Sequence, residues 1–402
     1  METSTRRRTA ADTKEPYQQQ RQLSILELPH GILVNILSRL PFKTIYNCRC
    51  VCKAWLNLLL DPYFAETHFA KSPTCLLLQP TRNRFHSRDL YMVDLEIPDL
   101  ADDRDALVKF HADFHFPTDS FEVVNSCNGF LCLCDSVCFE PYYVYNPITG
   151  EYVNIPDGRR LSECYVVSRF GVCPKSNQYK VVRFVGRFTV QDTFKWETEI
   201  YTLGTDNWRA VEGTFSSLGG LPSGAVLNGA LHWVVTDRRN SEFISCFDFE
   251  DEGFRSIVPP SQFGMHHKKR RKWMSLGVLG GCLYICDFPF DDHFDIWVMK
   301  DYGIRESWTK EFVIQTPITY NTGLRDFYQP IRLLGDGEIL MLHNNKALVS
   351  YNLKEGSFLD LDIYGVQSDI DAIAYNPSFV SLKGIAMGQN LKVLKVKPRN
   401  AV

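Results

Sequence analysis

The amino-acid sequence predicts an α+β protein of two domains. A small three-helix domain is followed by an all-β propeller of six blades, although five or seven blades also fit the spacing. Three observations support this prediction: helical periodicity in residues 26–68, its loss after residue 70, and strand-like hairpins that recur every 46 to 56 residues. The expected boundaries are a disordered polar arm over residues 1–22, the helical domain over 23–70, the propeller over 71–390 and a C-terminal tail over 391–402.

The N-terminal arm has no apolar run. Its residues are mostly polar and charged, and they lack the hydrophobic stretch of a secretory signal peptide. A polar segment of this kind buries too little apolar surface to fold alone. We therefore expect a disordered arm, on a protein that resides in the nucleus, the cytoplasm or both.

Residues 32–59 contain two amphipathic patterns, each typical of a helix with one apolar face. The first pattern consists of Ile32, Leu33, Ile36, Leu37 and Leu40. Pro41 ends this helix, because proline disfavours helical geometry in the residue before it. The second pattern consists of Ile45, Cys48, Cys52, Trp55 and Leu59. A unit of about 45 residues rarely supports its own core, so part of this surface must pack on the rest of the chain or on a partner.

The same segment contains a specific series of short motifs. They are Leu28-Pro29, Ile36-Leu37, Arg39-Leu40-Pro41, Lys43, Arg49, Val51-Cys52-Lys53, Trp55, Pro62, Phe64 and His68. In type and spacing these residues resemble the F-box, although Ile45 and Tyr46 stand where Leu is frequent in that family. The resemblance implies binding to the Skp-type adaptor of a ubiquitin ligase and, through it, to a cullin and a RING protein. The implied adaptor-binding residues are Leu28, Pro29, Leu33, Ile36, Leu37, Leu40, Pro41, Val51, Cys52 and Trp55.

After residue 70 the chain reads as a series of hairpins. Each one pairs an aromatic or β-branched strand with a polar turn, such as Thr149-Gly150 or Glu355-Gly356, and a return strand. Six aromatic anchors, separated by 54, 56, 46, 50 and 54 residues, mark the repeat: Tyr91, Tyr145, Tyr201, Phe247, Trp297 and Tyr351. This regularity predicts a repeat architecture.

A second marker, a turn followed by an apolar strand, precedes four of these anchors by 14 to 18 residues. It stands at Asn128-Gly129, Asn228-Gly229, Gly280-Gly281 and Asp336-Gly337, and in the period that lacks it Asn177 could turn the chain. Each period therefore holds about four strands, the content of a propeller blade. Residues 370–382 would supply the strand that closes the ring.

Four segments of the repeat region contain recognisable sequence motifs: VNSCNGFLCL, YNPITGEYVNIP, SGAVLNGALHWV and YNPSFVSL. They resemble the F-box-associated interaction domain of plant F-box proteins. Kelch propellers are less similar, because a Gly-Gly doublet occurs only at residues 219–220 and 280–281. The resemblance implies that the propeller selects a protein substrate, which the ligase then ubiquitylates for degradation.

Two other functions are compatible with a propeller: a scaffold unconnected with ubiquitin, and an enzyme with its site in the propeller channel. His232, His343 and Asp291-Asp292 are the residues that such an enzyme could use. The sequence contains no Gly-rich phosphate loop, H-E-x-x-H helix or G-x-S-x-G elbow. We therefore expect a non-catalytic subunit without a cofactor.

Composition limits the range of partners. With 402 residues, 45% hydrophobic and 23% charged, the chain is ordinary for a globular protein, and its net charge of −3 lacks the basic excess of a nucleic-acid binder. Its apolar runs are far shorter than the ~20 residues that span a bilayer. We expect neither nucleic-acid nor membrane binding.

The cysteine pattern favours thiols over metal ligands. Thirteen cysteines, an odd number, without a secretory signal indicate reduced thiols in an intracellular compartment. Cys127, Cys132, Cys134 and Cys138 lack the C-x2-C pairs of structural zinc sites. Cys132 and Cys134 alternate with Leu131 and Leu133, as expected for buried thiols on a strand.

Two oppositely charged segments follow the fourth anchor. Residues 266–272 are all basic or His, which fits a solvated loop, a nuclear localisation signal or a contact for an acidic partner. The candidate signal is Lys268, Lys269, Arg270, Arg271 and Lys272. Residues 287–295 are acidic, so the two segments could neutralise each other or form separate faces. Aromatic residues in these segments are candidate anchors for a substrate: Trp273, Phe288, Phe290 and Phe294.

Overall fold

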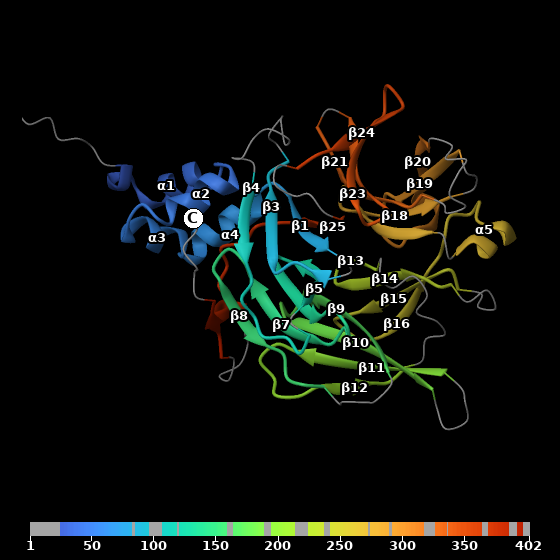
Figure 1. The fold of residues 1–402 in the computed structure, drawn as a ribbon, viewed down its shortest axis with the longest axis horizontal. Helices are drawn as coiled ribbons and strands as arrows, with labels where there is room; N and C mark the ends of the chain where they lie inside the picture. Colours follow the sequence, from blue (N-terminus) through green and yellow to red (C-terminus); the bar gives the residue numbers. More distant parts are fainter. Residues whose placement is uncertain are drawn as a thin grey trace, which may run out of the picture.

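A computed structural model confirms the predicted fold class: short N-terminal helices precede a six-bladed propeller (Figure 1). The structure describes residues 25–82, 85–95, 107–118, 120–158, 164–188, 194–213, 224–236, 242–271, 274–288, 292–316, 326–335, 337–363, 369–385 and 392–396. The expected N-terminal arm lies outside these residues.

The helical domain consists of short helices separated by two to four residues. They are η1 (Ile25–Glu27), α1 (His30–Leu37), α2 (Phe42–Cys48), α3 (Lys53–Leu59) and α4 (Pro62–Lys71). Asp61 caps α4, because its side chain accepts a hydrogen bond from the Phe64 amide at 3.2 Å. The second predicted stripe is divided between α2 and α3, since Cys52 is extended (φ −164°, ψ 170°) and turns the chain.

The propeller consists of six antiparallel sheets, each with four consecutive strands. Blade 1 contains β1 (Cys75–Arg82), β2 (Phe85–His86), β3 (Asp89–Val93) and β4 (Leu107–His111), with β25 (Asp369–Tyr375) paired to β1. Blade 2 contains β5 (Phe121–Cys127), β6 (Phe130–Asp135), β7 (Pro141–Asn146) and β8 (Glu151–Asn154). Blade 3 contains β9 (Tyr165–Val172), β10 (Tyr179–Phe188), β11 (Phe194–Thr202) and β12 (Arg209–Val211).

The other three blades repeat this plan. Blade 4 contains β13 (Ala225–Leu227), β14 (Ala230–Val234), β15 (Ile244–Asp248) and β16 (Phe254–Ile257). Blade 5 contains β17 (Ser275–Leu279), β18 (Cys282–Asp287), β19 (His293–Met299) and β20 (Trp308–Gln315), with α5 (Met265–Arg270) before it and η5 (Arg305–Ser307) within it. Blade 6 contains β21 (Tyr328–Leu333), β22 (Glu338–His343), β23 (Ala347–Asn352) and β24 (Ser357–Leu361).

The sequence repeat corresponds to this plan strand by strand. Counting from β25 in blade 1, every aromatic anchor lies on the third strand of its blade. The turn markers join first and second strands, and Asn128 (φ 49°) and Gly129 (φ 81°) show why these residue types stand there. The backbone turns through the left-handed region, which Asn and Gly tolerate best.

The C-terminal strand closes the ring as predicted. Strand β25 pairs with β1 in an antiparallel register from Cys75↔Tyr375 to Thr81↔Asp369. It also contacts β5 and β21, the first strands of the two neighbouring blades. Further along, α6 (Leu382–Ile385) and β26 (Leu394–Lys395) follow, and β26 pairs with β8. Two residues of the expected tail therefore extend blade 2.

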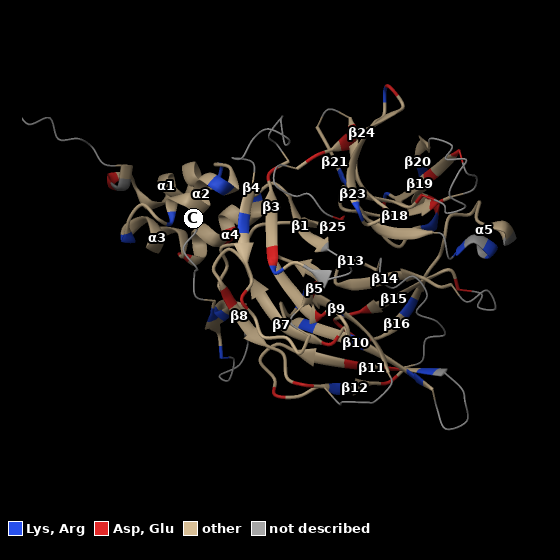
Figure 2. Ribbon diagram, viewed as in Figure 1, with Lys and Arg blue, Asp and Glu red and all other residues tan. Residues whose placement is uncertain are grey.

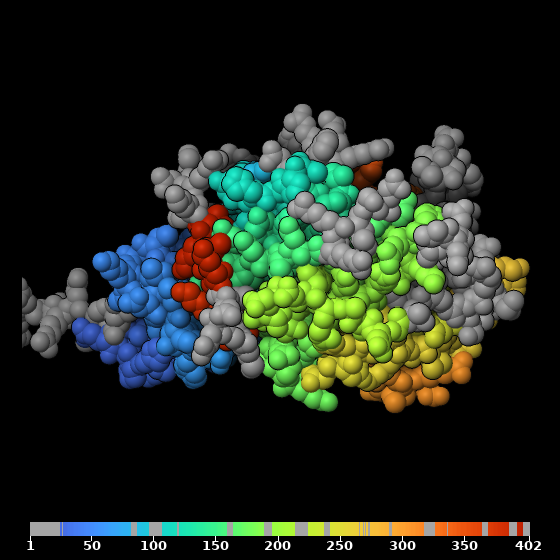
Figure 3. Space-filling view, turned by 90° about the horizontal axis from the view of Figure 1, so that it is seen from below, coloured from blue at the N-terminus to red at the C-terminus, as the bar shows by residue number. Residues whose placement is uncertain are grey.

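The helical domain and the propeller share one hydrophobic core. Leu33, Leu37 and Phe64 belong to the same buried cluster as Tyr145 of blade 2 and Phe379, which follows β25. The Phe379 ring lies 5.8 Å from Phe64 and 5.1 Å from His68, edge-on to both. Figure 3 shows the C-terminal segment, in red, at the surface between the helices and blade 2. The helical domain is therefore anchored to one side of the ring.

Candidate adaptor-binding face and propeller pocket

Helix α1 has apolar side chains on two faces. Leu33, Val34 and Leu37 point into the shared core and are at most 4% exposed. Ile32 and Ile36 are 49% and 41% exposed. Since residues four apart lie on the same side of a helix, these two isoleucines form an outward apolar ridge.

Other exposed apolar side chains belong to the same small domain. Within residues 25–63 they are Ile25, Leu28, Ile32, Ile36, Val51, Leu60 and Tyr63. We call this set the outer face. Single exposed apolar residues are ordinary, but a concentration of them in a small domain is typical of an interaction surface.

The structure corrects part of the predicted adaptor interface. Leu33 (4% exposed) and Leu37 (1% exposed) are core residues, because α1 packs against α4 and contributes this face to the shared core. The remaining predicted residues are exposed or half-buried: Leu28, Pro29, Ile36, Leu40, Pro41, Val51, Cys52 and Trp55. The sequence prediction did not include Ile32, which is 49% exposed beside Ile36, although its spacing of four from Ile36 was a usable signal.

The predicted substrate anchors Phe288 and Phe294 are also core residues. Their exposed fractions are 6% and 0%, and their rings stack on each other at 4.9 Å. Phe294 stacks on Tyr328 of blade 6 as well, at 5.4 Å. These aromatic side chains fill the space between two blades and cannot contact a substrate. Trp273 and Phe290 lie outside the described residues.

The basic segment is not a uniformly solvated loop. Part of it forms α5, at the end of the molecule opposite the helical domain (Figure 2). Arg271 is only 1% exposed; its Nη1 donates to the Val235 carbonyl at 3.2 Å, and its guanidinium lies 4.6 Å from the Phe243 ring. Arg271 is therefore removed from the predicted nuclear localisation signal, because a receptor cannot reach this buried side chain. Lys269 is exposed, and Lys272 lies outside the described residues.

The basic and acidic segments meet at one point. The Nε2 atom of His267 lies 3.4 Å from Oδ2 of the buried Asp287, and the His267 ring stacks on Phe263 at 4.3 Å. The sequence left open whether the two segments contact each other or form separate faces. At this position they are in contact.

Buried titratable groups in the blades have packing roles. Cys132 and Cys134 are buried on β6, and burial raises the pKa of Cys132 to about 12. Burial lowers the pKa of His232 to about 4, and its ring nitrogens lie 3.1 Å from the Ala225 carbonyl and 2.7 Å from the Tyr302 hydroxyl. His343 stacks on Tyr328 at 4.5 Å. Among the described residues, no three His, Cys, Asp or Glu side chains are grouped to hold a metal ion.

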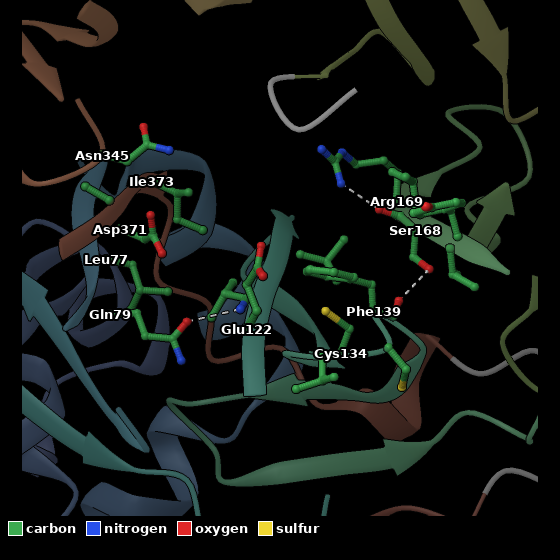
Figure 4. A pocket seen from close by; sticks show the side chains of 18 of the residues that line it. Leu77, Gln79, Glu122, Cys134, Phe139, Ser168, Arg169, Asn345, Asp371 and Ile373 are labelled. Atoms are coloured by element: carbon green, nitrogen blue, oxygen red, sulfur yellow. Dashed lines mark hydrogen bonds between the residues drawn. The ribbon is translucent and has the colours of Figure 1, made fainter. Parts of the chain in front are cut away.

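Two pockets occupy opposite ends of the propeller channel. A pocket of about 680 Å³ is lined by residues of blades 1, 2, 3 and 6 (Figure 4). A second pocket, of about 570 Å³, is lined by Phe69 of α4 and by residues of blades 1, 2, 4, 5 and 6. Strand β25, for example, contributes Asp371 to the first and Ala374 to the second. The larger pocket, which we call the channel pocket, therefore opens on the face away from α4.

Comparison with known proteins agrees with this architecture. The F-box domain family matches residues 25–67, and the F-box associated beta propeller domain family matches residues 85–382. The chain therefore belongs to the F-box proteins that carry an F-box associated β-propeller. In the part of the chain that the structure describes, no helix is both long enough and apolar enough to cross a bilayer.

Curated relatives from Arabidopsis thaliana are similar over most of their length. F-box protein At3g07870 is 32% identical over 382 residues, which cover 84% of this chain and 88% of the relative. F-box protein CPR1 is 28% identical over 379 residues, 86% of each chain. F-box/kelch-repeat protein At3g23880 is 28% identical over 355 residues, 82% of this chain and 89% of the relative.

Proposed function

We propose that this chain is the substrate-recognition subunit of a Skp-cullin-F-box ubiquitin ligase. The outer face of the F-box binds the Skp-type adaptor, and the propeller recruits a protein substrate for ubiquitylation and degradation. The observation that carries the proposal is the division of α1 into an inward face, around Leu37, and an outward face, around Ile36. The adaptor can then bind without unpacking the core.

The shared core supports the second half of the proposal. Because the F-box packs on the propeller through Phe64 and Phe379, its orientation relative to the channel is fixed. A substrate on the propeller is then held at a defined position relative to the adaptor, the cullin and the RING protein. This raises its effective concentration at the ubiquitin-charged enzyme, and the chain itself performs no chemistry. In this function the chain acts in the nucleus, the cytoplasm or both.

Co-purification tests the proposal. The full chain, co-expressed with a Skp-type adaptor, should elute from size exclusion as a one-to-one complex, whereas a scaffold or an enzyme unconnected with ubiquitin would elute without it. Deletion of the F-box is a poor control, because it would expose the core around Phe379. A point variant on the outer face, Ile36→Glu, keeps that core and is the matched control. Elution of the wild-type chain without the adaptor would refute the proposal.

A further inference from the structure

The pocket on the α4 side of the channel, which we call the F-box-side pocket, is lined by residues of both domains. Helix α4 contributes Phe69, and the segment that joins α4 to β1 contributes Thr74. The ring contributes residues of five blades, among them Arg332 of β21, and Asn376 follows β25. A ligand bound here would therefore contact the helical domain and the propeller at the same time.

The F-box-side pocket is positively charged. Among the described residues that line it, Arg332 is the only one with a charged side chain. The Arg332 guanidinium donates a hydrogen bond from Nη1 to the Thr74 carbonyl. Within the part of the chain that the structure describes, it forms no ion pair with a carboxylate. A carbonyl oxygen accepts a hydrogen bond but does not neutralise a cation, so the positive charge of Arg332 is not offset by the protein.

The hydrogen bond to Thr74 positions the Arg332 guanidinium without using all its donors. A guanidinium has five N–H donors in a planar fork, and the bond to Thr74 uses Nη1. The N–H groups of Nε and Nη2 have no partner among the described residues. A carboxylate can accept two parallel hydrogen bonds from such a fork. Arg332 is also half-buried, so less water competes for these donors than at an exposed site.

The strand that carries Arg332 is irregular at this point. The register of β21 with β22 shifts between Pro330 and Arg332. Such a bulge re-aims side chains and is frequent next to active sites. Ile331, Arg332 and Leu333 all line the pocket, whereas successive side chains of a regular strand point to opposite faces. The cation is therefore flanked by apolar residues of its own strand, and Leu333 is 40% exposed.

We propose that the F-box-side pocket binds an acidic segment of the substrate polypeptide. The carboxylate of an aspartate or glutamate lies at Arg332, and a neighbouring apolar side chain lies against Phe69 and Leu333. The pocket volume of about 570 Å³ lies within the range of sites that enclose a few side chains. This inference rests on the proposed function and deepens it, because it names the kind of segment that the propeller selects.

Three matched tripeptides test the proposal by calorimetry on the full chain, purified with the adaptor if the two form a complex and alone if they do not. The probes are acetyl-Leu-Glu-Leu-amide and its Gln and Lys counterparts, at low ionic strength. The Glu peptide should bind about 10-fold more tightly than the Gln peptide, a difference of about 1.4 kcal/mol, and the Lys peptide should bind most weakly. Added salt should weaken the Glu peptide selectively, because charge attraction is screened.

Variants assign the two contacts. Arg332→Gln should reduce the preference for Glu over Gln to about 2-fold or less, whereas Arg332→Lys should keep about 3-fold, because it retains the charge but loses the fork. Phe69→Ala should weaken the Glu and Gln peptides equally. Arg305→Gln, at an exposed position in η5, is the matched control and should change neither. If Arg332→Gln does not fold, Arg332→Lys and the salt dependence of the wild-type chain decide the charge assignment.

Several outcomes would overturn the inference. They are equal or tighter binding of the Gln or Lys peptide, a Glu preference unchanged in Arg332→Gln, no binding of any peptide at millimolar concentration, or equal binding of free glutarate, which would indicate a small-molecule site. A phosphoserine counterpart that binds about 10-fold more tightly than the Glu peptide would reassign the pocket to phosphorylated segments. Adaptor binding is measured separately on the same samples. Its loss would refute the ligase function, whereas peptide results decide the pocket.

Discussion

The two faces of α1 lead to opposite expectations for neighbouring residues. Ile36 is 41% exposed, so an adaptor can cover only this remaining part of its surface. Covering it contributes only about 1 kcal/mol to binding. In Ile36→Glu that contribution is lost, and an unpaired carboxylate enters a dry interface, which costs about 3–5 kcal/mol. We expect adaptor affinity to fall at least ~100-fold, while the melting temperature of the chain changes little.

Leu37 provides the control because it lies next to Ile36 in the sequence but points inward. The Leu37 side chain is only 1% exposed. Its replacement in Leu37→Ala should therefore leave a cavity and lower the folding stability by about 2–5 kcal/mol. The fraction that remains folded should bind the adaptor with wild-type affinity. Calorimetry with the adaptor and thermal melting of each variant provide the two measurements. The reasoning fails if Ile36→Glu melts like the wild type and still binds within about 3-fold of its affinity.

Three further predictions concern packing against Ser378 and Phe379, which follow β25. Phe379→Ala should cost about 3–5 kcal/mol and should increase hydrogen exchange in α1–α4 but not in blades 4 and 5; a uniform increase would contradict the shared core. Burial lowers the pKa of His68 to about 4, and neither ring nitrogen has a hydrogen-bond partner. As the pH falls, the His68 ring is therefore protonated in the unfolded chain before it is protonated in the folded chain. The free energy of unfolding should have its full value above pH ~6.5 and should fall by about 3 kcal/mol towards pH 4. His68→Phe should flatten this part of the pH profile, and His232, which is shifted in the same direction, should account for the slope that remains. Gly129→Ala should lower the melting temperature more than Gly281→Ala, since both have positive φ (81° and 77°) but only at Gly129 would a Cβ meet Ser378 Cβ, at 2.2 Å; equal losses would show that backbone strain alone decides.

Much of the fold could be predicted because its signals are local. The left-handed turns require Asn or Gly, and the third strand of each blade carries an aromatic anchor, so both features recur in the sequence at the period of a blade. The F-box motifs lie within one short segment, so they can also be identified from the sequence alone. Arg271 shows the limit of local reasoning. A run of basic residues predicts solvation, but the guanidinium stacks on Phe243, which another part of the chain supplies.

The candidate sites depended on contacts between distant parts of the chain. Sequence periodicity alone established that α1 is amphipathic and that six hairpin units follow it, because helix and strand repeats depend on neighbouring residues. Only the tertiary structure decided that Leu37 faces inward and Ile36 outward, that Phe288 and Phe294 fill the core, and that four blades build one pocket. The physical reason is that burial is a property of the packed chain. A side chain is covered or exposed according to what residues far away in the sequence place against it, as Phe379 does for the F-box.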